Sequence, residues 1–347
     1  MKKQKLRSNL ITYGIVLAAY VIVQALIAAD SLSSMMKGLL VPLCVYVVLA
    51  VSLNLVVGIS GELSLGHAGF MCVGAFSGAF FSKCIQDVLT FSPLRLLIAM
   101  LIGAAVAAVF GILIGIPVLR LKGDYLAIVT LAFGEIIKNV MNIFYVGIDG
   151  AGFHFSTQDE FALNLAADGR MIISGPTGIT QTPKDATFTA GIILVLITLF
   201  IVLNLIDSRD GRAIMSIRDN RIAAESIGIN ITKYKLMAFT ISAALAGAAG
   251  ALYAHNLSSL TAKKFDYNTS ILALVFVVLG GIGNIRGSII AAVLLTALPE
   301  LLRGLSSYRM LIYSIVLIVM MLFNWAPKAL EWRERNLGRF FKTSPNK

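Results

Sequence analysis

Three polar residues in the middle of one apolar run are the first candidates for chemistry in this sequence. Glu135, Lys138 and Asn139 lie close to the midpoint of the run 125–146. Ionisable groups are costly inside a membrane, and there they usually face a cavity or one another. Glu135 and Lys138 are three residues apart, so on a helix they can form an internal ion pair that fixes the rotation of that helix. Alternatively, Glu135, Asn139 and Thr130 line a route for a polar solute.

Two glycine-rich breaks in apolar sequence are the second candidate site. One break contains Ser64 and His67, and the other, over 280–288, contains Asn284. Glycine-interrupted segments in corresponding positions of two halves are typical of a substrate path built from broken helices, although small residues also permit tight helix packing. His67 is predicted to pack or to form a hydrogen bond rather than to relay protons, because the sequence indicates no second carboxylate within its reach.

Motifs for catalysis and metal binding are missing from the sequence. There is no G-x-x-x-x-G-K-[ST] phosphate loop, so the chain is not expected to split ATP itself. No H-E-x-x-H or G-x-S-x-G motif occurs, and Cys44, Cys72 and Cys84 form no C-x-x-C pair. We therefore expect no catalytic residues, no cofactor and no metal site, and we do not predict an enzyme.

Composition indicates a membrane protein built of helices. The 347 residues are 58% hydrophobic and 14% charged, and the mean hydropathy is +0.85. Soluble domains are about 45–50% apolar and roughly 25% charged, whereas repeated apolar runs of about 20 residues predict transmembrane helices. We expect an all-α polytopic membrane protein, with one transmembrane permease domain over 1–347 and about ten helices, some broken or re-entrant. The spans are predicted at 9–28, 36–57, 64–82, 94–119, 125–146, 187–206, 233–255, 268–283, 287–303 and 307–326.

The basic residues predict how the chain is oriented. The net charge is +11, but Lys and Arg gather at the termini and in alternate loops, which argues against nucleic acid as a partner. With the N-terminus inside the cell, 19 basic residues lie on the cytoplasmic side and nine on the other, in agreement with the positive-inside rule. Both termini are therefore predicted to be cytoplasmic. The longest loop, 147–186, is net negative and is predicted to be extracytoplasmic.

The N-terminal apolar run resembles a secretory signal. It follows a basic start and ends at two alanines. Its apolar part is about 20 residues long, however, and a signal peptide has an apolar region of roughly 7–15 residues. We therefore predict that it is retained as the first membrane span.

A polar island, 209–235, separates two long apolar runs and contains six basic residues. No proline occurs within 213–228, so a short helix is predicted there, ending at its final glycine. On a helical wheel Arg218, Arg221 and Glu225 share one face, with apolar residues on either side. This pattern suits a helix wedged between its own bundle and a second protein. A connector lying on the bilayer surface, with its arginines near lipid phosphates, fits as well.

Several sequence blocks in a fixed order carry a resemblance to a known family. They are SLNLVVG from Ser52, GELSLGHAGFMCVGA from Gly61, LRLKGDYLAIVTLAFGEI from Leu119, GPTGIT from Gly175, GRAI from Gly211 with AAESIG from Ala223, KYKLMAF from Lys233, and VVLGGIGNIRG from Val277. Together, over roughly residues 40–300, the blocks resemble the LivM family, the permease subunits of branched-chain amino acid ABC importers. Urea-type permeases look similar, but the run 130–135 is closer to the amino acid branch.

The resemblance implies a multi-subunit assembly in a bacterial inner membrane. The chain would be one half of a pore in membrane lipid, paired with a LivH-like second permease subunit. Two ABC ATPase subunits would bind on the cytoplasmic side, and a solute-binding protein on the extracytoplasmic side. The segment 209–232 would be the cytoplasmic coupling segment, whose general pattern is Glu-Ala-Ala, three residues and Gly. Here Ile222 stands in place of Glu, so Arg221 or Glu225 is expected to supply the charge contact. The implied coupling residues are Arg218, Arg221, Ala223, Ala224, Glu225 and Gly228.

The expected function is translocation of Leu, Ile or Val delivered by the binding protein, with ATP hydrolysis in the partner subunits. The candidate path residues are Ser64, His67, Thr130, Glu135, Asn139 and Asn284. One alternative is a permease of the same family for urea or another small amide or amino acid. Another is a secondary transporter driven by an ion gradient, with Glu135 as the coupling carboxylate. A membrane-embedded enzyme has no support, because no nucleophile–base pair is present.

Overall fold

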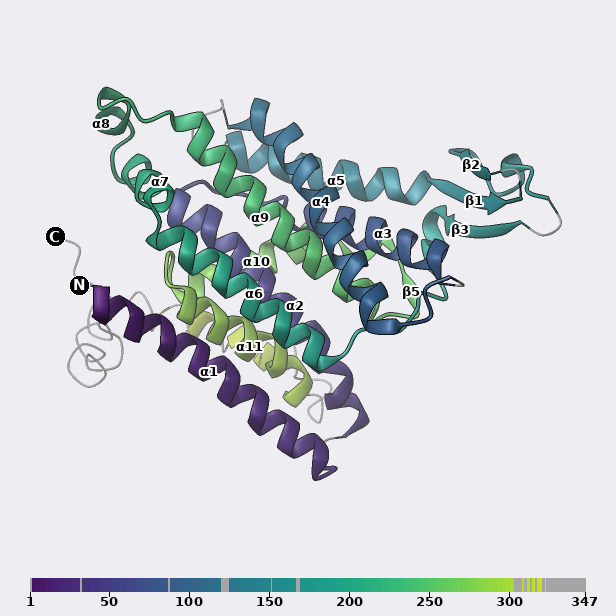
Figure 1. The fold of residues 1–347 in the computed structure, drawn as a ribbon, viewed down its shortest axis with the longest axis horizontal. Coiled ribbons are helices and arrows are strands. Elements are labelled where there is room, and N and C mark those ends of the chain that lie inside the picture. Colours follow the sequence, from purple (N-terminus) through teal and green to yellow (C-terminus); the bar gives the residue numbers. More distant parts are fainter. Residues whose placement is uncertain are drawn as a thin grey trace.

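A computed structural model shows a bundle of long helices with a small β-sheet at one end (Figure 1). The structure describes residues 2–302 except 32, 87, 120–124, 151 and 167–168, together with nine positions between 308 and 322. The predicted tenth span, the basic loop at Arg120 and Lys122 and the basic tail lie largely outside the described residues. Each of the other nine predicted spans contains a helix, which confirms the all-α membrane architecture.

Seven of the described helices are long and apolar enough to cross a membrane. They lie in α1 (Lys2–Ala28), α2 (Ser34–Asn54) with its continuation, α3 (His67–Ile85), α4 (Ser92–Val118), α5 (Tyr125–Ile143), α6 (Phe188–Asp207) and α9 (Ile231–Ala254). The predicted eighth and ninth spans are the shorter helices α10 (Tyr267–Gly280) and α11 (Ile285–Leu301), of 14 and 17 residues. α1 lies at the edge of the bundle, and only 11% of its apolar window is buried.

Both predicted glycine breaks are present. α2 continues into a buried six-residue π-helix, Leu55–Ser60, which ends at Gly61 with a φ of +74°. Extended chain then leads to the start of α3. The turn between α10 and α11 has Gly281 and Gly283 at φ values of +92° and +81°. Left-handed backbone of this kind favours glycine, so the glycines mark real interruptions of the helices.

The helices α3, α4 and α9 pack against one another through glycines. A Cβ added at Gly74 of α3 would lie 2.2 Å from the carbonyl oxygen of Gly247 in α9. A Cβ at Gly103 of α4 would lie 2.8 Å from the Gly74 carbonyl oxygen, and one at Gly250 would lie 2.0 Å from that of Met71. Small residues let membrane helices approach to backbone contact, which gains dispersion energy where no hydrophobic effect acts between helices.

The loop predicted over 147–186 contains strands that the sequence analysis did not predict. β1 (Tyr145–Asp149) is the central strand of an antiparallel sheet, between β2 (Gly152–Ser156) and β3 (Arg170–Ser174). β4 (Ile179–Thr180) pairs with β5 (Ser259–Leu260), which follows α9. The sheet projects from the end of α5, beyond the helices (Figure 1).

A buried ion pair fastens α4 to the chain that leads into α6. The Arg95 side chain donates to both carboxylate oxygens of Asp185 at 2.7 Å. Burial raises the pKa of Asp185, but hydrogen bonds from Arg95 and Ser92 outweigh that effect, and the pKa lies below its ordinary value.

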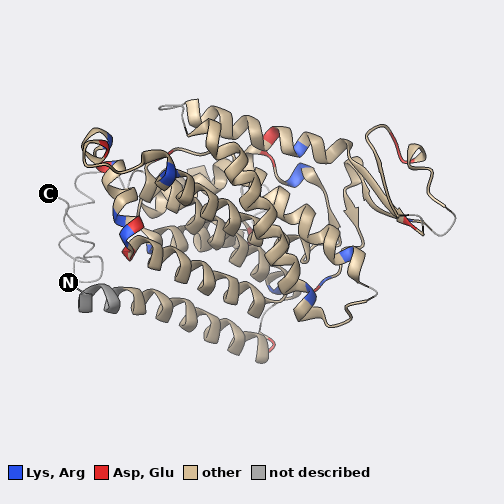
Figure 2. Ribbon diagram, turned by 45° about the horizontal axis from the view of Figure 1, so that its top comes forward, with Lys and Arg blue, Asp and Glu red and all other residues tan. Residues whose placement is uncertain are grey.

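Charged residues mark the two ends of the bundle. Lys, Arg, Asp and Glu gather at the end with the sheet and at the opposite end, with one further group at mid-length of α5 and beside it (Figure 2). The opposite end carries α7 (Arg209–Asp219) and α8 (Arg221–Ser226). The first turns of α1 lie at this same end (Figure 1). Hereafter the two ends are called the sheet end and the α7–α8 end.

The glycine contact between α4 and α9 yields a stability prediction. Gly247→Val places side-chain atoms against Ala107 and the Gly103 backbone of α4, and backbone cannot yield as a flexible side chain does. We expect a loss of about 3 kcal/mol, at the upper end of the roughly 1–3 kcal/mol that overpacking a close-packed site typically costs. Gly14→Val in α1 is the matched control, because nothing lies within 4 Å of its added Cβ. Thermal unfolding in detergent measures both variants, and equal melting temperatures would contradict the packing assignment.

Candidate coupling segment and translocation path

Three side-chain caps shape the polar segment between α6 and α9. Ser208, Asn220 and Asn230 precede α7, α8 and α9, and each side chain accepts a hydrogen bond from the amide three residues later, at 3.0–3.1 Å. Ser and Asn are favoured at this position because their short side chains satisfy an otherwise unpaired amide. The segment is therefore two short, separately capped helices.

The prediction of one helix over 213–228 is wrong. Asn220 has extended backbone, with φ −154° and ψ 103°, and its side-chain oxygen binds the Ala223 amide. A short amide side chain competes for local backbone groups in this way, and the competition ends one helix and starts the next. Arg218 therefore lies on α7, whereas Arg221 and Glu225 lie on α8, and the three do not share one helical face. The predicted stop is present, since Gly228 follows α8 with a φ of +84°.

The two short helices have an inner and an outer side. Ile214, Ile217 and Ala224 are buried against the bundle. On the outer side, Ile222 is 80% exposed and Ile227 is 74% exposed. The inner side therefore anchors the segment, and the outer side faces away from the bundle.

Most of the predicted coupling residues lie on that outer side. Arg221, Ala223, Glu225 and Gly228 are exposed, whereas Ala224 is the buried anchor of α8. Arg218 differs from its neighbours. Its guanidinium Nη1 donates to the backbone carbonyl of Gly58 at 2.8 Å, in the π-helix that continues α2.

The starts of α3 and α10 meet α5, and predicted path residues gather there. The Leu65 amide donates to Oγ1 of Thr130 at 3.0 Å, and the Ala68 amide donates to Oγ of Ser270 at 3.0 Å. The first turn of a helix has amides without partners within the helix. Thr130 and Ser270 supply partners to this unwound region, so Thr130 is a backbone cap.

His67 and Ser64 lie in the same region, but among the described residues only the His67 side chain has a hydrogen-bond partner. His67 Nε2 is 2.8 Å from the Ser52 hydroxyl, which itself donates to the Leu49 carbonyl. The ring thus ties α3 to α2, which confirms the predicted hydrogen-bonding role. Ser64 is fully buried, and its hydroxyl has no hydrogen-bond partner among the described residues.

Glu135 joins α5 to the start of α10. One carboxylate oxygen pairs with Lys138, and the other accepts from the Tyr267 amide at 3.2 Å. The predicted ion pair is therefore confirmed. The carboxylate also neutralises the partial positive charge at the start of α10, a role that the sequence did not indicate.

A polar face extends from this pair toward the outside of the bundle. Asn139 on α5 is exposed, as are Tyr267 and Asn268 on α10, and the Glu135 and Lys138 side chains are 29% and 18% exposed. Charged groups at mid-length of a membrane helix face a cavity or another protein rather than lipid. This polar face is therefore a candidate wall of the predicted route.

The second glycine break lies at the α7–α8 end, away from the start of α10. Asn284 caps α11, with its side chain accepting from the Gly287 amide at 3.3 Å. Asn54, which the sequence analysis did not single out, is fully buried beside this break. It accepts from the Gly283 amide and donates to the Ser288 hydroxyl, both at 2.9 Å. The sequence did contain a signal for Asn54, because it is a lone amide side chain within an apolar run.

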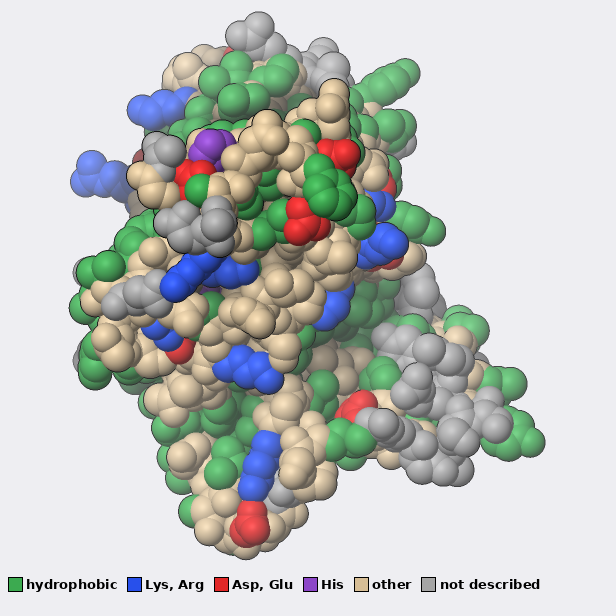
Figure 3. All heavy atoms as spheres, turned by 90° about the vertical axis from the view of Figure 1, so that its right-hand side faces the viewer, with side chains coloured by type: hydrophobic (Ala, Val, Ile, Leu, Met, Phe, Trp, Pro, Cys, Tyr) green, Lys and Arg blue, Asp and Glu red, His purple; other side chains and the backbone are tan. Residues whose placement is uncertain are grey.

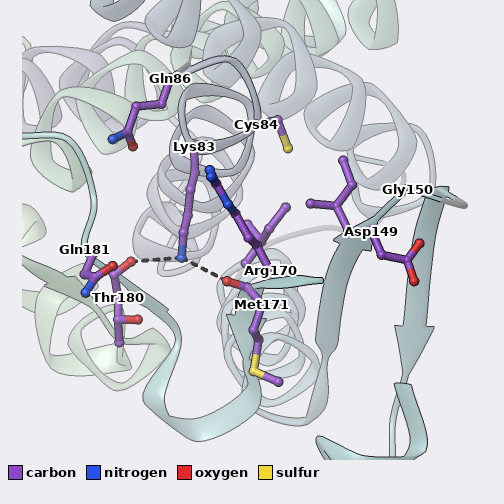
Figure 4. Close-up of a pocket in the computed structure, with 11 residues that line it drawn as sticks. Lys83, Cys84, Gln86, Asp149, Gly150, Arg170, Met171, Thr180 and Gln181 are labelled. Carbon is purple, nitrogen blue, oxygen red and sulfur yellow. Dashed lines mark hydrogen bonds between the residues drawn. The ribbon is translucent and has the colours of Figure 1, made fainter. Parts of the chain in front are cut away.

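The sheet end contains a hollow of about 700 Å³ between the end of α3 and the sheet. Figure 4 shows that Lys83 reaches across it, donating to the carbonyls of Met171 and Thr180 at 3.1 and 3.0 Å. Arg170 and Asp149 also line the hollow. Its lining is largely polar, so it suits water and charged groups.

The Glu135–Lys138 pair yields a double-mutant prediction. Glu135→Gln still accepts from the Tyr267 amide but leaves Lys138 without its partner. We therefore expect a lower melting temperature for this single variant than for Glu135→Gln/Lys138→Gln. Residues in direct contact typically show coupling of about 0.5–3 kcal/mol. Additive effects of the two substitutions in thermal unfolding would show that the pair does not fix α5.

Comparison with known proteins identifies the family. Residues 35–324 match the family described as branched-chain amino acid transport system / permease component. The chain is 36% identical over 296 residues to the high-affinity branched-chain amino acid transport system permease protein LivM of Salmonella typhimurium and to that of Escherichia coli, covering 82% of this chain and 67% of each relative. It is 24% identical to the nucleoside ABC transporter permease protein NupC of Lactococcus lactis, over 78% of this chain and 86% of that protein. No solved structure matches the chain at a comparable level. The predicted LivM resemblance is confirmed: the chain belongs to the family of branched-chain amino acid transport permease components and is a transport subunit of the ABC type.

Proposed function

We propose that this chain is one half of the pore of an ATP-driven importer of Leu, Ile and Val. The other half is a second, LivH-like permease subunit, two ATPase subunits bind at the α7–α8 end, and a solute-binding protein delivers the amino acid at the sheet end. The observation that carries the proposal is the capped α7–α8 segment, which is anchored on one side and apolar and exposed on the other.

The outer side of α8 supports docking of an ATPase. Ile222 and Ile227 supply apolar contact area, and Arg221 and Glu225 supply charges of both signs beside it. Buried apolar anchors surrounded by charges are the usual composition of a specific protein interface. Ile222, which replaces the expected Glu, then acts as an apolar anchor, and the charged contacts fall to Arg221 and Glu225.

The polar face of α5 and α10 supports a route along the edge of the chain. Asn139, Tyr267 and Asn268 are exposed there, beside the Glu135–Lys138 pair. An amino acid brings a zwitterionic backbone and an apolar side chain. Polar groups on one wall and apolar helices around it suit transient passage, and a second permease subunit supplies the opposite wall.

The sheet end supports contact with a solute-binding protein. Phe153 and Phe155 of β2 are exposed, and Phe161 is 87% exposed. Figure 3 shows this end, where hydrophobic side chains lie among acidic and basic ones around a hollowed surface. Aromatic side chains are enriched in protein interfaces. The hollow beside Lys83 then lies under the docked protein and receives the solute.

The proposed orientation places the α7–α8 end and both termini in the cytoplasm, in a bacterial inner membrane. The excess of basic residues in the corresponding loops supports it. The start of α1 and the α7–α8 segment lie at one end of the bundle, as this orientation requires.

The proposed mechanism is alternating access driven from outside the chain. Closure of the ATPases on ATP moves α7 and α8, and with them α6 and α9, to which the segment is joined on either side. The two glycine breaks allow the helices to tilt relative to one another, which opens the path at one end and closes it at the other.

An ion-coupled secondary transporter is the weaker alternative. Glu135, its required coupling carboxylate, is engaged by Lys138 and by the Tyr267 amide. Both oxygens of that carboxylate are therefore already engaged, so neither is free to bind a coupling ion.

Reconstitution tests the function directly. The chain, its second permease and two ATPase subunits in proteoliposomes, with the binding protein added, are expected to accumulate labelled Leu only when ATP is present. Unlabelled Ile and Val should compete for uptake, whereas urea and ribonucleosides should not. Proteoliposomes containing this chain alone are the control. Leu accumulation by the chain alone, driven by an ion gradient, would establish the secondary transporter instead.

Cysteine labelling tests both the orientation and the docking side. In a background without Cys44, Cys72 and Cys84, Ile222→Cys is expected to react with a membrane-impermeant maleimide in inverted vesicles but not in intact cells. Bound ATPase subunits should slow this reaction roughly tenfold. Phe161→Cys is the control and is expected to react from the opposite side, at a rate that the ATPases do not change. Position 220 is unsuitable for the label, because the Asn220 side chain caps α8. Labelling of Ile222→Cys from the medium would show that the α7–α8 end is extracytoplasmic. Equal labelling rates with and without ATPases would show that α8 is not part of the interface.

A further inference from the structure

Arg218 is an exposed residue of α7, but unlike the other predicted coupling residues it donates a hydrogen bond to the backbone of the bundle. Nη1 donates to the Gly58 carbonyl at 2.8 Å, while Nε and Nη2 both donate to the carboxylate of the adjacent Asp219. The stem of Arg218 lies on Gly61, where an added Cβ would be 2.6 Å from its Cγ. The residue is thus held at three places between α7 and the first glycine break.

The carbonyl that Arg218 contacts is in the last turn of the π-helix. Carbonyls at a helix end lack partners within the helix and carry a partial negative charge. A guanidinium is well suited to that position, because it brings a positive charge and several donors in fixed directions. π-helical turns are uncommon and frequently mark functional sites.

Gly58 also joins the first break to the second. A Cβ at Gly58 would lie 2.3 Å from the Gly283 amide nitrogen and 1.9 Å from Oδ1 of Asn54. Asn54 in turn binds the Gly283 amide and the Ser288 hydroxyl, and both Asn54 and Ser288 are fully buried. The two breaks therefore pack against one another as one unit, and a movement of Gly58 must displace Gly283.

We propose that Arg218 is a positioning residue that moves both glycine breaks together with α7, rather than a contact for the ATPase. This inference rests on the proposed function, in which α7 and α8 move with the ATPases. A displacement of α7 passes through the guanidinium to Gly58, and from there through Asn54 to the turn between α10 and α11. Because α2 leads into the first break and α11 follows the second, the displacement reaches helices that are not joined to α8 along the chain.

This role is tested by replacing the contact between Arg218 and Gly61 with a disulfide that forms only under oxidising conditions. An added Cβ at Gly61 lies 3.4 Å from Cβ of Arg218, close to the roughly 3.5–4.5 Å that a disulfide requires. The variant Gly61→Cys/Arg218→Cys, in the background without native cysteines, therefore exchanges a polar contact for a covalent one, and Gly61→Cys alone measures the cost of a side chain at the left-handed position 61. The full complex is assayed in proteoliposomes under reducing and oxidising conditions.

The reduced double variant is expected to take up Leu about tenfold more slowly than the parent, within the roughly 5–150-fold range of typical coupling between sites. It should still co-purify with the ATPases and hydrolyse ATP. Oxidation should restore most of the uptake, because the disulfide again joins α7 to the break. Arg218→Cys and Gly61→Cys alone are the controls, and neither should respond to oxidation. Arg218→Lys, which keeps the charge without the forked geometry, should fall between the parent and Arg218→Cys.

Four results would overturn the inference. Arg218→Cys at the parent rate would show that the contact is unnecessary, and an oxidised double variant that stays inactive would show that α7 and the break separate during transport. Loss of co-purification would make Arg218 a docking residue. Failure of the disulfide to form would show that residues 61 and 218 are not adjacent in the protein. A parent complex without ATP-dependent Leu uptake is a different result, because it contradicts the proposed function whatever the variants do.

Discussion

Backbone that leaves a helix inside a membrane must find its hydrogen-bond partners within the protein, and this constraint governs the whole chain. Water is absent from the hydrocarbon region, so each unpaired amide or carbonyl costs several kcal/mol. In the described residues the chain leaves its helices at two glycine breaks, one before α3 and one at the α7–α8 end, and polar side chains from other helices meet the freed groups. Thr130 and Ser270 accept hydrogen bonds from amides at the start of α3. Glu135 accepts one from the first amide of α10, and Asn54 accepts one from the turn before α11. The positions of these side chains in turn fix which helices lie next to one another.

Much of the helical framework follows from the sequence, because apolar length and glycine content are local properties. The long spans, both glycine breaks and the stop at Gly228 are all visible as runs or interruptions. The break at Asn220 is different. It depends on whether an amide side chain turns back to its own backbone, and helical periodicity carries no information about that choice. The sheet was likewise missed, since its strands are short and pair only once α5 has positioned them.

Individual contacts were harder to predict than the elements that hold them. The Glu135–Lys138 pair was accessible because both residues lie on one helix at a fixed spacing. The partners of Asn54, Thr130 and Arg218 lie between 65 and 234 positions away. Such pairs form only when whole helices pack together. The sequence pattern therefore singles out the polar residue but does not identify its partner. Arg218 illustrates the difference: its charge was noticed, but its inward direction was not.

The glycine contacts between α3, α4 and α9 limit where a solute can travel. At Gly74, Gly103 and Gly247 the three backbones touch, and not even a methyl group fits between them. Leucine is far wider than a methyl group, so it cannot pass between α3, α4 and α9 at this level. A solute that crosses this subunit must therefore pass elsewhere. Under the proposed function, α3, α4 and α9 move as one block, and the boundary with the second permease subunit remains for the solute.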